Sequence, residues 1–229
     1  MRFSLRKLTL LDYPGHVACT VFTGGCNFRC PFCHNPSLVT AAAGDLEFTM
    51  GDILEFLEKR SGQLDGICIT GGEPLLHRDT LLLAQAAKAL NYSVKLDTNG
   101  SFPELLNEVL AEKMIDYVAM DIKNSPAKYA VTTGINVLEK VRKSVDLLKT
   151  AAVEHEFRTT VTGNLHETAD FIEIGKWLTG EKRYFLQPFA DSGAILGGDP
   201  GQFTVSDARL LEFLDAVRNF IPAAEIRGR

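Results

Sequence analysis

The chain has 229 residues, of which 45% are hydrophobic and 23% charged, the ordinary balance of a globular protein that buries its own core. Its formal net charge of −5 provides no cationic field for nucleic acid or anionic lipid, so we expect no nucleic-acid partner. No apolar run approaches the roughly 20 residues that span a bilayer, and residues 1–7 lack the apolar block of a signal peptide, so we expect no membrane partner and a cytoplasmic location.

Short β-branched runs alternate along the chain with longer amphipathic runs. Residues 1–15 are expected to form an N-terminal flap, extended over 3–13, before Pro14 and Gly15 turn the chain into the first strand. Strands are predicted at 17–22, 66–70, 93–96, 117–120, 156–161 and 184–188. Helices are predicted at 50–60, 78–90, 103–113, 136–149, 168–178 and 206–220. Asp79 and Ser206 suit N-caps, and Pro103 suits a first helical turn.

Strands that alternate with helices usually form a parallel sheet through right-handed crossovers. Six such units in one domain of residues 1–229 predict an α/β fold, either a partial (β/α)6 TIM-like barrel or an open doubly wound sheet. In both architectures ligands bind at the carboxyl ends of the strands. The residues that follow each strand are therefore the first candidates for a site.

Chemically unusual residues follow four of the six predicted strands. These segments are Thr23-Gly24-Gly25-Cys26, Gly71-Gly72-Glu73-Pro74, Asp97-Thr98-Asn99-Gly100 and Asp121-Ile122-Lys123. Each alone could be a turn or a cap. Four such segments in register with four strands indicate a single site.

Three cysteines, Cys26, Cys30 and Cys33, lie within eight residues of the first of these loops. A [4Fe–4S] cluster needs a sulfur ligand at three or four iron corners, so three thiolates would leave one iron open. Zinc is the alternative, but its closed sites take four ligands, and His34 is directly adjacent to Cys33. Two further cysteines sit in apolar runs and are expected to be buried small hydrophobes: Cys19 and Cys68.

The spacing Cys-x3-Cys-x-aromatic-Cys, with Phe32 as the aromatic residue, resembles the signature of radical S-adenosylmethionine (SAM) enzymes. Gly71-Gly72-Glu73-Pro74 resembles the GGEP motif of the same family, and the resemblance extends over nearly the whole chain. It implies the partial barrel of the radical SAM type and a [4Fe–4S] cluster on the three cysteines. It also implies reductive cleavage of SAM to a 5′-deoxyadenosyl radical, with no catalytic side chain beyond the cluster and SAM.

The finer motifs resemble the activating enzymes of glycyl radical proteins. The segments concerned are Cys33-His34-Asn35, Asp97-Thr98-Asn99-Gly100 and Asp121-Ile122-Lys123. In this resemblance Asp97, Thr98 and Asp121 lie near the sulfonium and could help to hold a monovalent cation. Gln187, in an apolar run at the end of the last predicted strand, could contact SAM or merely satisfy backbone groups. The residues implied to contact SAM are Phe32, Asn35, Gly71, Gly72, Glu73, Asp97, Thr98, Asp121, Lys123, Arg158 and Gln187.

The partner implied by the resemblance is a glycyl radical enzyme, with a flavodoxin- or ferredoxin-type electron donor. Ala190 stands where pyruvate formate-lyase activases have a histidine, whereas residues 11–15 and 23–36 resemble the activating proteins of anaerobic ribonucleoside-triphosphate reductase. An anaerobic ribonucleotide reductase is therefore the favoured partner. Two alternatives stay open: a radical SAM enzyme that acts on a small molecule, like the 7-carboxy-7-deazaguanine synthases, and a non-catalytic iron–sulfur or zinc module.

Overall fold

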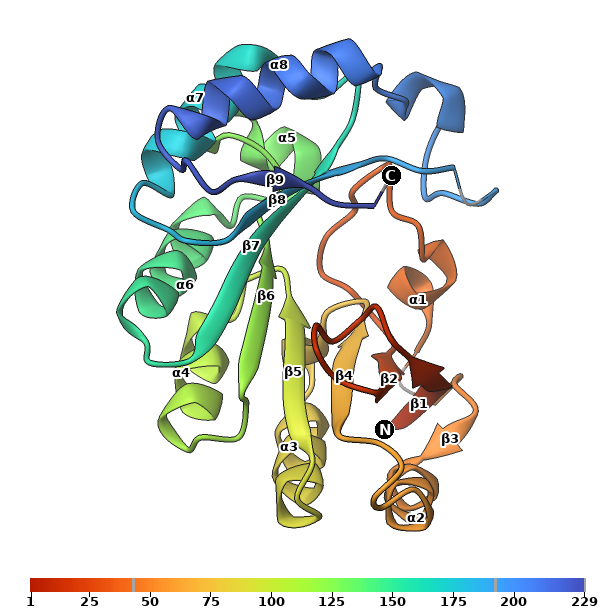
Figure 1. Ribbon diagram of the computed structural model, residues 1–229. Helices are drawn as coiled ribbons and strands as arrows, with labels where there is room; N and C mark the ends of the chain where they lie inside the picture. The colour runs from red at the N-terminus through yellow and green to blue at the C-terminus, as the bar shows by residue number, and fades with distance from the viewer. Residues whose placement is uncertain (43, 192, 229) are drawn as a thin grey trace.

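A single curved sheet runs through residues 1–42, 44–191 and 193–228, the part of the chain that this computed structural model describes (Figure 1). Its strands lie in the order β3-β1-β2-β4-β5-β6-β7-β8-β9. Their bounds are β1 Arg2–Thr9, β2 Ala18–Thr23, β3 Phe48–Thr49, β4 Gly66–Gly71, β5 Ser93–Thr98, β6 Tyr117–Asp121, β7 Glu154–Val161, β8 Tyr184–Pro188 and β9 Glu225–Ile226.

The strands from β2 through β9, apart from β3, pair in parallel and in chain order. A doubly wound sheet would reverse its order at a switch point, so the sheet has the order of a partial barrel. The predicted α/β partial barrel is therefore confirmed, and the six predicted strands agree with the observed ones to within two residues. The short strands β3 and β9 were missed because neither carries a periodic pattern.

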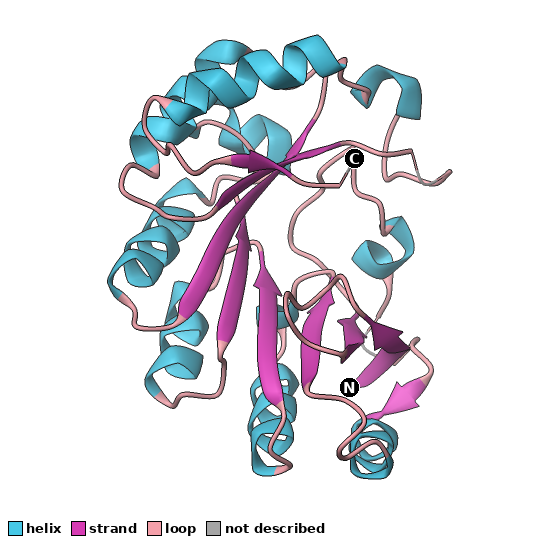
Figure 2. Ribbon diagram, in the orientation of Figure 1, coloured by secondary structure: helices cyan, strands magenta, loops and turns pink. Residues whose placement is uncertain are grey.

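Helices cover the outer, convex face of the curved sheet (Figure 2). All six predicted helices are found, and two short ones, α1 and α5, were missed. The bounds are α1 Pro36–Thr40, α2 Met50–Lys59, α3 Asp79–Ala89, α4 Pro103–Ala111, α5 Tyr129–Thr133, α6 Leu138–Thr150, α7 Thr168–Trp177 and α8 Asp207–Arg218, with 3-10 turns at Pro74–Leu76, Pro126–Lys128 and Pro200–Phe203. Within the described ranges no helix is both long enough and apolar enough to cross a bilayer.

Two of the three predicted helix starts are confirmed. The Ser206 hydroxyl accepts a hydrogen bond from a backbone N–H of α8, and Pro103 is the first residue of α4. Asp79 is the first residue of α3 rather than its N-cap, so that prediction was wrong by one position. Its carboxylate lies 2.9 Å from the amino group of Met1, and an acidic side chain in a first turn also suits the helix dipole.

The N-terminal segment predicted as an extended flap is a strand of the sheet over most of its length. β1 pairs antiparallel with β2, with Phe3 opposite Thr23, and so extends the sheet rather than lying apart from it. The following loop carries Tyr13, which is buried beneath the start of β4. A Cβ atom at Gly66 would lie only 2.9 Å from the Tyr13 ring, so this end of β4 requires glycine.

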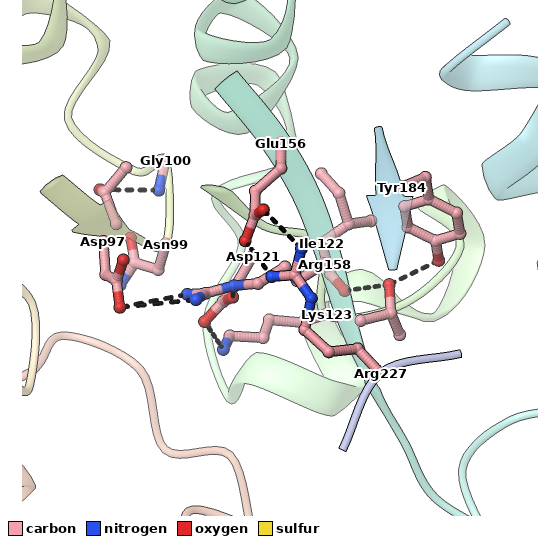
Figure 3. Close-up of polar contacts among 12 residues, drawn as sticks. Asp97, Asn99, Gly100, Asp121, Ile122, Lys123, Glu156, Arg158, Tyr184 and Arg227 are labelled. Atoms are coloured by element: carbon pink, nitrogen blue, oxygen red, sulfur yellow. Dashed lines mark hydrogen bonds and ion pairs between the residues drawn. The ribbon is translucent and has the colours of Figure 1, made fainter. Parts of the chain in front are cut away.

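An ion pair ties the C-terminal strand to the interior of the barrel. Glu156 of β7 is fully buried, and its carboxylate accepts hydrogen bonds of 2.7 and 2.9 Å from Arg227, which directly follows β9 (Figure 3). The Tyr117 hydroxyl donates a third bond of 2.7 Å, and the Arg227 guanidinium lies 3.4 Å from the centre of the Phe185 ring. A buried carboxylate is tolerated when it is paired in this way, and the pairing fixes β9 on the edge of the sheet.

Candidate active site

A cavity opens at the carboxyl ends of β2, β4, β5, β6 and β7, where the sequence predicts the site. Its lining contains all of the predicted site residues except Gln187: Cys26, Cys30, Phe32, Cys33, Asn35, Gly71, Gly72, Glu73, Asp97, Thr98, Asp121, Lys123 and Arg158. Gln187 on β8 lies opposite Thr160 of β7, which does line the cavity, so Gln187 stands one strand beyond the wall. The cavity is also lined by residues for which the sequence motifs predicted no binding role: Phe28, His34, Val39, Thr70, Asn99 and Thr160.

The loop that carries the three cysteines is held from two sides. On one side the Arg29 backbone N–H donates a 2.8 Å hydrogen bond to the carbonyl of Thr133, the last residue of α5. On the other side the Asn27 side chain donates to the Ser101 hydroxyl at 2.8 Å and accepts from the Asn99 side chain at 3.0 Å. These bonds fix the loop between α5 and the end of β5, so the thiols have defined positions before any ligand binds.

Burial favours the protonated form of two of the three thiols. It raises the pKa of the Cys30 thiol to about 12 and also raises that of Cys26. Metal binding would replace the proton at each sulfur, since only thiolates coordinate metals. Among the described residues no three His, Cys, Asp or Glu side chains are grouped closely enough to hold a single metal ion. Three thiols on the wall of one cavity fit a larger group with several iron atoms.

The end of β4 packs directly against the cysteine loop. A Cβ atom at Gly72 would lie 1.9 Å from the carbonyl oxygen of Gly25, and one at Gly71, where φ is +131°, would lie 2.3 Å from backbone atoms of Thr23. The resemblance implies that both glycines contact SAM, which is one reason for a position without a side chain. The structure gives a second reason, because two backbone segments of the protein itself meet here.

Glu73 links this backbone contact to the end of β5. It is fully buried, and its carboxylate accepts hydrogen bonds from the Thr98 hydroxyl at 2.7 Å, the Asn99 backbone N–H at 2.7 Å and the Leu75 backbone N–H at 3.0 Å. Burial raises the pKa of Glu73 to about 7 in spite of these three donors.

A chain of alternating charges crosses the wall of the cavity from β5 to β7 (Figure 3). Lys95 forms an ion pair with Asp97. Arg158 lies 3.5 Å from Asp97 and 2.9 Å from Asp121. Lys123 lies 2.9 Å from Asp121. Burial alone would raise the carboxyl pKa values, but Arg158 and Lys123 hold the pKa of Asp121 at about 2, and Arg158 and Lys95 lower that of Asp97. Two carboxylates thus face three cations, and Lys95 is a member that the sequence did not reveal.

The parallel barrel places three thiols at its rim and buried charges beside them, and this set of side chains fits an iron–sulfur group and a charged ligand. The family model of the radical SAM superfamily matches residues 20–178. The chain therefore belongs to the radical SAM superfamily and is a radical SAM enzyme. Membership in this superfamily implies a [4Fe–4S] cluster and SAM as cofactors.

Three relatives are informative. A Methanocaldococcus jannaschii protein, named as a candidate glycyl-radical enzyme activating enzyme, is 34% identical over 82% of this chain and 79% of its own. The pyruvate formate-lyase-activating enzyme of Streptococcus mutans is 30% identical over 80% and 74% of the two chains. A 7-carboxy-7-deazaguanine synthase of Thermococcus kodakarensis is 28% identical over 90% and 80%.

Among solved structures, Streptococcus suis SuiB superimposes with a TM-score of 0.69. The match covers 90% of this chain but only 48% of the SuiB chain, at 15% sequence identity. At this identity the match shows a shared fold.

The buried carboxylate of Glu73 predicts a particular pH dependence of stability. Its pKa is about 7 in the folded protein and 4.5 ordinarily, so between these values the folded state binds more protons than the unfolded state. The stabilising contribution is therefore complete below pH 4.5 and is lost as the pH rises through 7. The difference in unfolding free energy between wild type and Glu73→Gln should fall by about 3 kcal/mol across this window.

Urea unfolding of the cluster-free proteins at pH 4.5 to 8 measures this difference. The buried His166, whose pKa burial lowers to about 4, acts in the opposite direction but is common to both proteins and cancels in the subtraction. A difference that does not change with pH would show that Glu73 is already ionised in the folded protein throughout this range.

Proposed function

We propose that this protein activates a glycyl radical enzyme, with Cys26, Cys30 and Cys33 as the ligands of its cluster. The observation that carries the proposal is the convergence of these thiols and Glu73 with the charged side chains of Asp97, Asp121, Lys123 and Arg158 on one cavity. Two of the three relatives named above carry activating-enzyme names. We place the reaction in the cytoplasm, with a flavodoxin- or ferredoxin-type protein as the electron donor.

The cofactors, when bound, would supply one-electron reduction of SAM and homolytic cleavage of an S–C bond. The residues of this chain would hold and orient them. Glu73 presents a carboxylate that suits the SAM amino group, and Lys123 presents an ammonium that suits its carboxylate. The Phe32 ring is buried in the cavity wall and lies 6.2 Å from the ring of Phe203, so it packs the site rather than reacting. Asn35, two residues after the last cysteine, is a further polar contact, together with the other predicted polar residues Asp97, Thr98, Asp121, Arg158 and Gln187.

The favoured partner is an anaerobic ribonucleoside-triphosphate reductase. The motifs at residues 11–15 and 23–36 support this partner. Ala190 after β8 also supports it, because pyruvate formate-lyase activases resemble this chain here but have a histidine at this position. Ala190 is exposed there, while the Phe189 ring stacks on His34 with 4.9 Å between ring centres. Catalysis on a small molecule is the second candidate, and the relative named as a 7-carboxy-7-deazaguanine synthase favours it.

The first prediction concerns the cluster ligands. Cys30→Ala removes one of three thiolates, so reconstituted protein should lose most of its iron, sulfide and visible absorbance, and SAM cleavage should fall to background. Cys19→Ala is the matched control, because Cys19 is fully buried in β2 outside the cavity lining, and it should keep the cluster. Full cluster content in Cys30→Ala would remove this residue from the ligand set.

The second prediction concerns the monovalent cation that the resemblance implies. Asp97 and Asp121 are already paired with Lys95, Arg158 and Lys123, so we expect SAM cleavage by wild type to be equal in potassium and tetramethylammonium chloride at the same ionic strength. Lys95→Met leaves Asp97 short of a buried partner, and its activity should then require potassium. Lys59→Met, at an exposed lysine of α2, is the control. A wild-type enzyme that needs potassium would show that a cation binds in addition to Lys95.

The proposed function itself is tested on the partner. Reduced enzyme, SAM and an anaerobic ribonucleotide reductase should give a stable glycyl radical signal on the reductase in electron paramagnetic resonance (EPR) spectra. Replacing the target glycine by alanine should abolish the signal without affecting SAM binding. Silence with several glycyl radical enzymes, together with turnover of a deazapurine precursor, would establish the small-molecule alternative instead.

A further inference from the structure

Asn99, the residue that follows β5, is buried, and its neighbours fix the orientation of its side-chain amide. The amide oxygen accepts hydrogen bonds from the Ser101 backbone N–H at 2.9 Å and from the Ser101 hydroxyl at 2.6 Å. A reversed amide would place its NH2 group against the Ser101 backbone N–H, donor against donor. The NH2 group therefore faces the other way, toward the cysteine loop.

The two hydrogens of this NH2 group have two acceptors on the cysteine loop. The nitrogen lies 3.0 Å from the Asn27 side-chain oxygen and 3.9 Å from the Cys26 sulfur. The longer contact is weak while the thiol is protonated, because a neutral sulfur is a weak acceptor. A thiolate is an ionised acceptor, and hydrogen bonds to ionised acceptors are shorter and stronger. We therefore expect the contact to tighten when a metal replaces the proton of Cys26.

The backbone of Asn99 is held as firmly as its side chain. Its N–H donates to the buried Glu73 carboxylate at 2.7 Å. The next residue, Gly100, has a φ of +74°, and a Cβ atom there would lie 2.0 Å from the Met120 side chain, so the turn requires glycine. The Gly100 carbonyl accepts from the Ser144 hydroxyl of α6 at 2.7 Å. Asn99 is thus positioned by contacts that do not involve the cysteine loop.

The hydrogen-bond donors to sulfur are concentrated at one of the three cysteines. Besides Asn99, the Phe28 backbone N–H lies 3.4 Å from the Cys26 sulfur. In the part of the chain that the structure describes, no hydrogen bond to the sulfur of Cys30 or Cys33 is found. Because the Phe28 donor belongs to the backbone, Asn99 is the donor to Cys26 that a substitution can remove.

We propose that the Asn99 side chain donates a hydrogen bond to the sulfur of Cys26 when this residue holds the cluster, and so raises the reduction potential of the cluster. The inference rests on the proposed ligation by Cys26. A donor to sulfur stabilises the extra negative charge of the reduced form, and such bonds are among the factors that set cluster potentials. Asn99 is accordingly a positioning residue that acts through Cys26.

The test is Asn99→Leu, which nearly preserves the size of the side chain and removes its NH2 group. The reconstituted variant should hold as much iron and sulfide as wild type, with a midpoint potential shifted to more negative values in an EPR-monitored redox titration. Asn27→Leu is the matched control, because it breaks the same tether between Asn99 and the cysteine loop but leaves the donor to Cys26 in place. Its potential should equal that of wild type.

A second variant, Asn99→Asp, keeps the test decisive if Asn99→Leu folds poorly. An aspartate oxygen can still accept from both donors of Ser101, which Asn99→Leu leaves without an acceptor. Its other oxygen replaces the nitrogen that faces Cys26, so the donor to sulfur is lost. The midpoint potential of Asn99→Asp should therefore also be more negative than that of wild type.

Three results would overturn the inference while the proposed function stands. The first is a wild-type potential in both Asn99 variants. The second is an equal shift in Asn99→Leu and Asn27→Leu, which would assign the effect to a loosened loop. The third is loss of the cluster from both Asn99 variants, which would make Asn99 an anchor of the loop alone. If Cys26→Ala retains the full cluster, the ligation by Cys26 fails and the inference fails with it.

Discussion

The contact on which the site depends is the meeting of two backbone segments, the end of β4 and the cysteine loop. The Glu73 backbone N–H donates to the Gly25 carbonyl at 2.8 Å, and Gly72 passes so close to Gly25 that no side chain fits between them. Because the loop rests on the sheet in this way, the thiols face the carboxyl ends of the parallel strands. The same turn buries the Glu73 carboxylate where Thr98 and Asn99 donate to it, which joins β5 to the contact.

The charges beside this contact are arranged to be stable without solvent. A buried charge is tolerated when oppositely charged groups are held close to it. Arg158 is such a partner for both Asp97 and Asp121, which lie on the neighbouring strands β5 and β6. Parallel pairing brings this about, because Asp121 and Arg158 are opposite residues of β6 and β7. The ion pairs therefore hold the charge pattern of this wall, and the proposed binding of SAM here would need little reorganisation.

The sequence predicted the parts of this architecture that have local signals. Alternating periodicities located six strands and six helices, and the motifs after four strands named most of the cavity wall. Gln187 was proposed from its place at the end of a strand, and it lies on β8, next to Thr160 of β7, which lines the cavity. The pairing of β1 with β2 and the start of α3 at Asp79 depend on contacts that the local pattern does not contain.

The missed residues of the site share a physical reason. Lys95 resembles an ordinary polar residue of a strand, and only its spacing of two from Asp97, which puts both on one face, indicates an internal ion pair. Asn99 belongs to a motif that was recognised, but its contact with the cysteine loop follows from tertiary structure.

The central claim is that three cysteines hold a four-iron cluster with one iron left open for SAM. Mössbauer spectra of protein reconstituted with iron-57, recorded with and without SAM, test this claim most directly. The account predicts a [4Fe–4S] spectrum in which one iron of the four changes its parameters when SAM is added, while the other three keep theirs. A cluster whose four irons do not respond to SAM, or a mononuclear metal site, would contradict it.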